Sequence, residues 1–282
     1  MWRITWRRFR RSRLAVGALI YVALVTLLAA AAPLIANPAR LVPYGPDDVD
    51  VAHRLLPPDP EHRLGTDDLG RDVLARMLHG ARVSLTVGFL ATAIALVIGS
   101  LLGAIAGYYG GAADWIVSRA IEVVLCFPFL FLNLGIVALF GPSLFTVMIA
   151  LGLTSWTTNA RFMRGEFLRL REMEFAQAAR ASGARDTRIM LRHLLPNALA
   201  PVLVSASFGV ASAILTESAL SFLGFGVPLP TATWGSLLNT AREYIQFAWW
   251  LALFPGVAIF LTVAAFNVIG DRFRDALDPR AE

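Results

Sequence analysis

The sequence predicts an all-α membrane protein with six transmembrane helices. Of its 282 residues, 57% are hydrophobic and 16% are charged, whereas a soluble domain has about 25% charged residues. Several apolar runs reach about 20 residues, the length a helix needs to cross the hydrocarbon core of a bilayer. A transmembrane β-barrel would require short alternating strands, which these long continuous runs do not form.

The six predicted helices follow the apolar runs, at about Leu14–Ala36, Val83–Gly107, Trp115–Phe140, Ser143–Phe162, Leu199–Phe222 and Ala248–Ile269. The first run resembles a secretory signal peptide, but it exceeds the usual length of about 7–15 residues and more spans follow, which favours an uncleaved helix. We divide the chain into an N-terminal part, 1–82, with the first helix and an external loop, and a core, 83–282. The core contains a cytoplasmic loop at 163–198.

The distribution of Arg predicts the orientation. All 25 basic residues are Arg, and with six spans 18 of them fall on one side of the membrane and seven on the other. Positive charge concentrates on the cytoplasmic side of membrane proteins. Both termini and the loop at 163–198 are therefore predicted to be cytoplasmic.

Two absences exclude particular sites. A nucleotide-binding P-loop needs a Lys that reaches the phosphates, and the sequence contains no Lys. If the protein uses ATP, another chain must bind it. The single cysteine, Cys126, excludes a disulfide framework and is predicted to be buried within an apolar run.

Small residues mark two predicted spans as closely packed. Gly99, Gly103 and Gly107 recur every fourth residue, so they share one helix face on which a neighbouring backbone can approach. The span at Leu199–Phe222 is also rich in Gly, Ala and Ser. Such a span either packs tightly or lines a pathway, and the two interpretations are compatible.

The loop between the fourth and fifth spans has the pattern of two short helices joined by a bend. The stretch from Glu174 contains strong helix formers and ends at Gly183, a residue typical of helix C-termini. The second predicted helix carries Arg185 and Arg188 on its polar face and stops before Pro196. It can lie on the membrane surface or dock into a soluble partner, and the pattern alone favours the surface position.

The stretch "QAARASGARDTRIMLRHLLPN" resembles the EAA loop of ABC importer permeases. Five positions are in register with that loop: Ala178, Ala179, Gly183, Leu195 and Pro196. Two positions depart from the pattern, because Gln177 replaces a Glu and His193 replaces an Ile. The resemblance implies that the loop is the coupling helix that docks into an ATPase subunit, which reverses the preference for a membrane-surface position.

The resemblance extends over nearly the whole chain and is strongest to the C-type permease of dipeptide, oligopeptide and nickel importers. Three stretches carry it: "HRLGTDDLGRDVLARMLHGARVSL", "ESALSFLGFGVPLPTATWG" and "FNVIGDRFRDALDPR". It implies a type I ABC importer permease fold in the bacterial inner membrane. The implied partners are a homologous second permease, two ATPase subunits that hold ATP and magnesium, an extracytoplasmic solute-binding protein and the lipid bilayer. No nucleic-acid partner, catalytic residue, metal site or cofactor on this chain is expected.

Charged and polar residues in the spans are candidates for a function, since charges are costly in a membrane. Glu217, beside Ser218 and Ser221, is either a hydrated or paired carboxylate at the interface or an acid that faces the translocation path. Arg119 and Glu122 can pair on one helix face. Pro128 predicts a kink in the third span, and Asn133 can bond a neighbouring helix.

Two other classes of protein fit the sequence less well. An ion-driven secondary transporter would carry ionisable groups at mid-membrane and internal repeats, and a membrane-embedded enzyme would need clustered His, Asp or Glu. Mid-span charges are nearly absent, and the four His are scattered on both sides of the membrane. Short peptides are the preferred substrate, with nickel or glutathione-like molecules as alternatives.

Overall fold

The computed structural model describes residues 6, 8–10, 12–36 and 42–277. Among these residues the secondary structure is helical, with isolated bridges but no strands. The helices are α2 (Arg13–Ile35), α3 (Val73–Tyr109), α4 (Gly111–Leu125), α5 (Phe129–Phe140), α6 (Leu144–Leu170), α7 (Glu174–Ala181), α8 (Asp186–Arg188), α9 (Leu195–Phe222), α10 (Trp234–Tyr244) and α11 (Trp250–Leu277). A 3₁₀ turn (Val51–His53) precedes α3, and a π-helix (Ile189–Leu194) joins α8 to α9.

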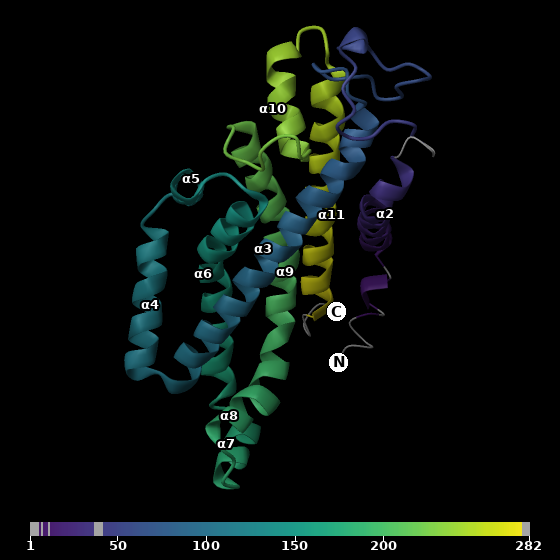
Figure 1. Ribbon diagram of the computed structural model, residues 1–282. Coiled ribbons are helices and arrows are strands. Elements are labelled where there is room, and N and C mark those ends of the chain that lie inside the picture. The colour runs from purple at the N-terminus through teal and green to yellow at the C-terminus, as the bar shows by residue number, and fades with distance from the viewer. Residues whose placement is uncertain (1–5, 7, 11, 37–41, 278–282) are drawn as a thin grey trace.

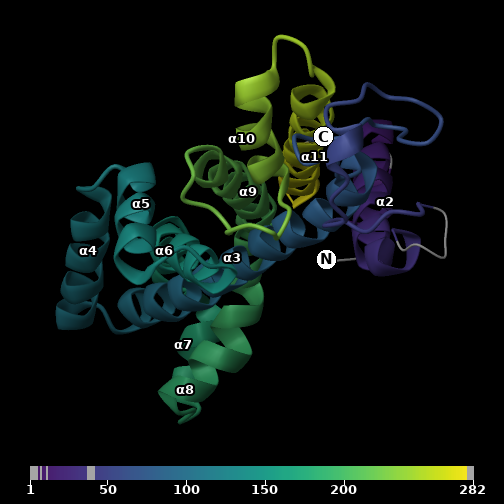
Figure 2. The ribbon, with the colours of Figure 1, turned by 45° about the horizontal axis from the view of Figure 1, so that its top comes forward.

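The long helices form a bundle around α3, which packs against α6 and α9 (Figure 1). Helices α2 and α11 lie on one flank of α3, and α4 and α5 lie on the opposite flank (Figure 2). The 42–72 segment and α10 cover one end of the bundle, whereas α7 and α8 project from the other end. Phe9 and Phe273 pack edge to face, which brings the beginning of α2 close to the end of α11.

Within the described part of the chain, four helices are long and apolar enough to cross a membrane, namely α2, α3, α9 and α11. Helices α4 and α5 reach that length only as a pair, and they are bent by 86°. The third span predicted at Trp115–Phe140, with a kink at Pro128, is thus two helices that break at Pro128, the residue before α5. Helix α6 has 27 residues, but Thr154, Thr157 and Asn159 interrupt its apolar run.

The α3–α6 contact depends on glycine. A β carbon at Gly99 would lie 2.6 Å from the Trp156 carbonyl oxygen, and one at Gly107 would lie 2.6 Å from the Arg164 carbonyl oxygen. Gly103 lies between them and has equally little space against Ala160. The three glycines thus form the close packing face that the sequence predicts, and α6 is the helix that occupies it.

Polar contacts fix the 42–72 segment to the bundle. Asp72, the N-cap of α3, accepts a hydrogen bond from the Ala75 amide, and its other oxygen lies 2.9 Å from His62 Nδ1. Arg71 Nε donates to Asp67 Oδ2 at 2.7 Å. The other Asp67 oxygen accepts the Leu69 and Arg71 amides within the loop, and α3 begins only at Val73.

Candidate transport cavity and coupling loop

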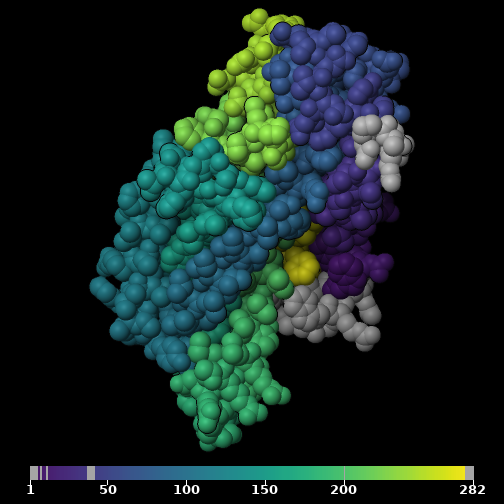
Figure 3. Space-filling model, viewed as in Figure 1, coloured from purple at the N-terminus to yellow at the C-terminus, as the bar shows by residue number. Residues whose placement is uncertain are grey.

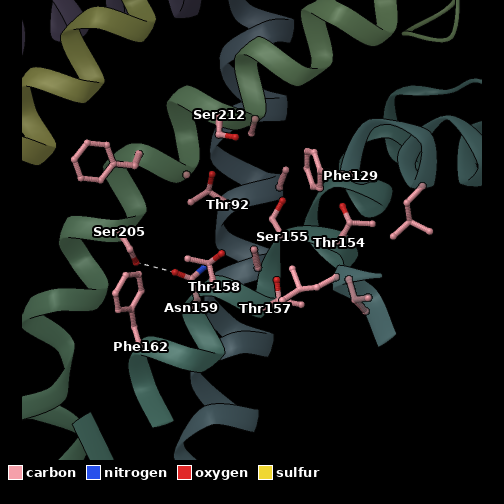
Figure 4. Close-up of a pocket in the computed structure, with 18 of the residues that line it drawn as sticks. Thr92, Phe129, Thr154, Ser155, Thr157, Thr158, Asn159, Phe162, Ser205 and Ser212 are labelled. Carbon is pink, nitrogen blue, oxygen red and sulfur yellow. Dashed lines mark hydrogen bonds between the residues drawn. The ribbon is translucent and has the colours of Figure 1, made fainter. Parts of the chain in front are cut away.

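A cavity of about 380 Å³ lies between the long helices (Figure 4). Its lining comes from α3, from α4 and α5 with the break between them, from α6 and from α9. Small-molecule sites in proteins typically measure about 300–1,000 Å³. The cavity is therefore large enough to hold part of a small solute.

Hydroxyl and amide groups line one side of this cavity, and none of the described lining residues is charged. The polar lining residues are Thr92, Thr154, Ser155, Thr157, Thr158, Asn159, Ser205 and Ser212. Ser205 Oγ donates to Asn159 Oδ1 at 2.7 Å, which connects α9 to α6 (Figure 4). Such a surface offers hydrogen bonds to a polar solute without selecting for the sign of its charge.

The remaining lining is aromatic and aliphatic. Phe127 and Phe129 come from the break between α4 and α5, Phe162 comes from α6, and Phe208 comes from α9. The break at Pro128 thus places two aromatic rings in the cavity wall. Cys126, predicted to be buried, is instead exposed, at the C-cap where α4 ends before the break.

The cavity is open on one side of the isolated chain. Thr158 and Ser212 line it and are exposed, even though both lie on long helices of the bundle. An exposed hydroxyl group on an apolar helix has no hydrogen-bond partner in lipid other than its own backbone. The open side therefore favours a polar or protein neighbour.

Glu217 is enclosed by the chain rather than placed in this cavity. Its side chain is fully buried between α3, α9 and the beginning of α10. The carboxylate accepts hydrogen bonds from Ser221 Oγ at 2.7 Å and from Ser84 Oγ at 3.2 Å. Ser84 Oγ also accepts the Trp234 amide at 3.2 Å, and Ser218 donates to the Ile214 carbonyl. In this chain, Glu217 connects helices.

The predicted bend in the loop after α6 is present at Gly183. This residue has a φ of +77°, a conformation that glycine adopts without the strain a β carbon causes. The Ala184 amide donates to Ala179 O, and the Gly183 amide donates to Arg180 O, which is the Schellman ending of a helix. Gln177 and Ala178 lie on the exposed face of α7.

The second half of the loop differs from the prediction. Pro196 does not stop the helix, because it lies in the first turn of α9, where its missing N–H costs little. The π-helix before it spaces the backbone bonds more widely, with the Leu195 amide donating to Met190 O. Asn197 Nδ2 donates to His193 O at 2.7 Å and satisfies that carbonyl. The loop therefore continues into α9 without a break.

The loop has one buried face and one exposed face. Ala176, Ile189 and Leu194 are fully buried and pack with the ends of α3 and α6. Gln177, Arg185, Arg188, Arg192 and the large apolar Leu191 are exposed. This loop projects from the bundle in the space-filling view (Figure 3). Its apolar face is occupied within the chain, whereas its basic face is available to a partner.

Two groups of residues in the candidate site were not predicted from the sequence. The polar run 154–159 in α6 stands out in an apolar span and is the signal that could have predicted the cavity. Asn133 does bond Thr154, at 3.1 Å, and so joins α5 to α6. The second group is the contact of Tyr108 with the loop, and no motif indicates it.

Comparison with known proteins identifies the family. Residues 99–282 match the family described as "Binding-protein-dependent transport system inner membrane component". The chain belongs to this family of transport permeases. Residues 1–58 of the permease match a second family, the "N-terminal TM domain of oligopeptide transport permease C".

Curated relatives cover the permease over almost its whole length. It is 43% identical to the dipeptide transport system permease protein DppC of Alkalihalophilus pseudofirmus, over 99% of this chain and 90% of that protein. It is 40% identical to the glutathione transport system permease protein GsiD of Pectobacterium atrosepticum, over 99% of this chain and 91% of that protein. The chain is thus nearly as similar to a relative named for glutathione transport as to one named for dipeptide transport.

Solved structures support the fold. The permease superposes on a chain of the inward-facing MetNI methionine ABC transporter with a TM-score of 0.56 and 21% identity. The match covers 71% of this chain and 96% of that chain. At this identity the likeness establishes a fold of the type I permease kind, and it says nothing about substrate.

Proposed function

We propose that this chain is one permease subunit of an ATP-driven importer that moves short peptides across the bacterial inner membrane. The observation that carries the proposal is the projecting loop from α7 to the π-helix, whose basic face is exposed and whose sequence resembles a coupling helix. A chain without Lys cannot form a P-loop. The free energy of ATP hydrolysis on another chain must therefore reach this chain through a contact such as this loop.

The topology we propose has six membrane crossings, with both termini in the cytoplasm. The bent α4–α5 pair is the third crossing, and α6 is the fourth despite its polar run. An even number of crossings agrees with the packing of Phe9 on Phe273 and with the excess of Arg on one side. The 42–72 segment and α10 then face the outside, where a solute-binding protein delivers the substrate.

A second, homologous permease closes the cavity in this proposal. The exposed Thr158 and Ser212 would face lipid in a single chain, whereas a partner chain gives them hydrogen-bonding neighbours. The translocation path then runs between two permeases, and this chain contributes the wall formed by α3, α6 and α9. Glu217 supports that wall from behind instead of meeting the substrate.

Short peptides fit the uncharged cavity. Peptides share amide groups, which hydroxyl and amide side chains can bond, but their side chains and net charges vary. An uncharged lining accepts that variety and leaves selection to the binding protein. A glutathione-like peptide would fit by the same chemistry. Nickel is disfavoured, since the described residues contain no group of three or more His, Cys, Asp or Glu that could hold a metal ion.

Two cytoplasmic ATPase subunits complete the assembly, and all ATP and magnesium bind to them. ATP can drive transport only if it favours one conformation of the permease over the other. A loop that is packed on α3 and α6 and continues into α9 gives the ATPase contact such a preference. The rival, a transporter driven by an ion gradient, would need ionisable groups in the path, and the described cavity lining has none.

Affinity purification from membranes in mild detergent tests this assembly. We expect the chain to be isolated together with a second permease and with ATPase chains that contain P-loops. ATP hydrolysis by the complex should rise when a peptide-loaded binding protein is added. Isolation of the chain alone, in a form that transports peptides without an ATPase, would overturn the proposal.

A further inference from the structure

Tyr108, at the cytoplasmic end of α3 in the proposed topology, contacts both halves of the coupling loop. Its side chain is buried, and its hydroxyl donates a 2.6 Å hydrogen bond to Asp186 Oδ1 in α8. The guanidinium of Arg180 in α7 lies over its ring, 5.8 Å from the ring centroid. Arg180 and Asp186 lie three residues before and three residues after Gly183. One aromatic side chain thus spans the bend.

The backbone joins the loop to only two of the helices that line the cavity. Helix α6 leads into α7 through the non-helical residues Arg171–Met173, and the π-helix leads directly into α9. Helix α3 also lines the cavity, through Ala91, Thr92 and Ala95. However, its chain continues into α4, so side chains alone connect it to the loop.

The end of α3 is also bonded by Arg171, the residue that follows α6. Arg171 Nη1 donates to Gly107 O at 3.0 Å and to Tyr108 O at 3.2 Å, which satisfies carbonyls that a helix end leaves free. In the same half of α3, Gly99, Gly103 and Gly107 hold it against α6. A force applied to Tyr108 is therefore applied to a closely packed pair of helices.

We propose that Tyr108 fixes the angle between the coupling loop and the α3–α6 pair. This inference rests on the proposed docking role of the loop. The turn at Arg171–Met173 and the bend at Gly183 are the places where the loop can pivot when the ATPases close. The Tyr108 contacts with Arg180 and Asp186 oppose both motions. Without the hydroxyl bond, closure of the ATPases moves the loop but moves α3 less.

The test compares transport with ATP hydrolysis in the complete complex reconstituted in vesicles. Tyr108→Phe keeps the ring under the Arg180 guanidinium but removes the hydroxyl and its bond to Asp186. We expect ATP hydrolysis to stay within about twofold of wild type while the peptides transported per ATP fall about tenfold, the effect that loss of one hydrogen bond to a charged acceptor has on an equilibrium. Tyr109→Phe is the matched control, because Tyr109 is the exposed neighbour, and it should leave the ratio unchanged.

Substitutions at Asp186 give a second, independent reading. Asp186→Asn retains an oxygen acceptor and should keep most of the ratio, whereas Asp186→Ala should lower it as Tyr108→Phe does. The double variant Tyr108→Phe with Asp186→Ala should be no worse than either alone, since both remove one interaction. A wild-type ratio of peptides transported per ATP in both Tyr108→Phe and Asp186→Ala, or an equal loss in Tyr109→Phe, would overturn this role of Tyr108.

The same experiment separates this inference from the proposed function. If Gly183→Pro abolishes transport while the Tyr108 and Asp186 variants behave as wild type, the loop couples ATP hydrolysis to transport, but Tyr108 does not fix the angle of the loop. If wild-type vesicles transport peptides without ATP, the proposed function itself fails.

Discussion

Gly103 of α3 lies directly against the Ala160 carbonyl of α6, with no space between them for a β carbon. Gly99 and Gly107 repeat the contact one turn away on either side, so backbone rather than side chains forms the interface. Close backbone approach strengthens van der Waals packing in membranes, where the hydrophobic effect does not drive helices together. Helix α6, which supplies most of the polar cavity wall, is thereby held in one register with α3.

Substitution at Gly103 should destabilise the protein. We expect Gly103→Ala to lower the stability of the folded state by about 1–3 kcal/mol, because the added methyl group forces two backbones apart. The control is Gly165→Ala in α6, where a β carbon meets no atom within 4 Å and where alanine favours the helix by about 1 kcal/mol. Thermal denaturation in detergent distinguishes them. Equal melting temperatures for the two variants would show that the glycine contact does not matter.

Substitutions at the coupling loop should separate hydrolysis from transport. Gly183→Pro is incompatible with the left-handed backbone at this position, since proline holds φ near −65°. Arg188→Glu reverses a charge on the exposed face that we assign to ATPase docking. Both variants should insert into the membrane normally and lose most peptide transport.

The control for Arg188→Glu is the same change at Arg274, an exposed Arg in the last turn of α11, outside the loop. It should transport as wild type does. Normal transport in both loop variants would remove the loop from the coupling mechanism.

Glu217 should prove structural. Glu217→Leu removes the acceptor of Ser84 and Ser221 inside the protein, and each buried polar group left unpaired costs about 1–3 kcal/mol. Glu217→Gln keeps an acceptor oxygen and should cost less. The measurement is the melting temperature of each variant, together with its substrate preference. A stable Glu217→Leu protein with altered substrate preference would instead place this residue in the path.

Much of the fold could be predicted because the length of an apolar run is a local property of the sequence. The glycine face, the break at Pro128 and the bend at Gly183 each depend on one residue type with a specific backbone effect. The continuation of the helix through Pro196 was not predictable in this way, because it depends on the π-helix that precedes it. The surroundings of Glu217 also escaped prediction, since Ser84 lies 133 residues earlier in the chain.

In the candidate site, too, local features could be predicted from the sequence, whereas contacts between distant residues could not. Both faces of the loop follow from its amphipathic pattern, and Ile189, Leu194 and Arg188 lie as that pattern predicts. The role of Tyr108 depends on the position of α3 relative to α7 and α8, which no local pattern encodes. The cavity likewise needs α3, α6 and α9 together, and only its α6 contribution forms a visible polar run.

The proposed path can be mapped with single cysteines. In a Cys126→Ser background, which removes the one native thiol, Thr158→Cys and Ser212→Cys should react with a membrane-impermeant thiol reagent. The matched control is Leu101→Cys, on an exposed face of α3 that does not line the cavity, and it should stay unreactive because lipid covers it. Equal protection of all three positions would contradict a water-accessible path along α6 and α9.

The central claim is that ATP, bound to other chains, drives peptides through this permease, and vesicle uptake tests it most directly. The purified complex is reconstituted, and uptake of a labelled dipeptide is measured with the binding protein, with and without ATP and with a protonophore. We predict uptake that needs both ATP and the binding protein and that is unchanged when the protonophore collapses the proton gradient. Uptake that proceeds without ATP and stops with the protonophore would contradict the account.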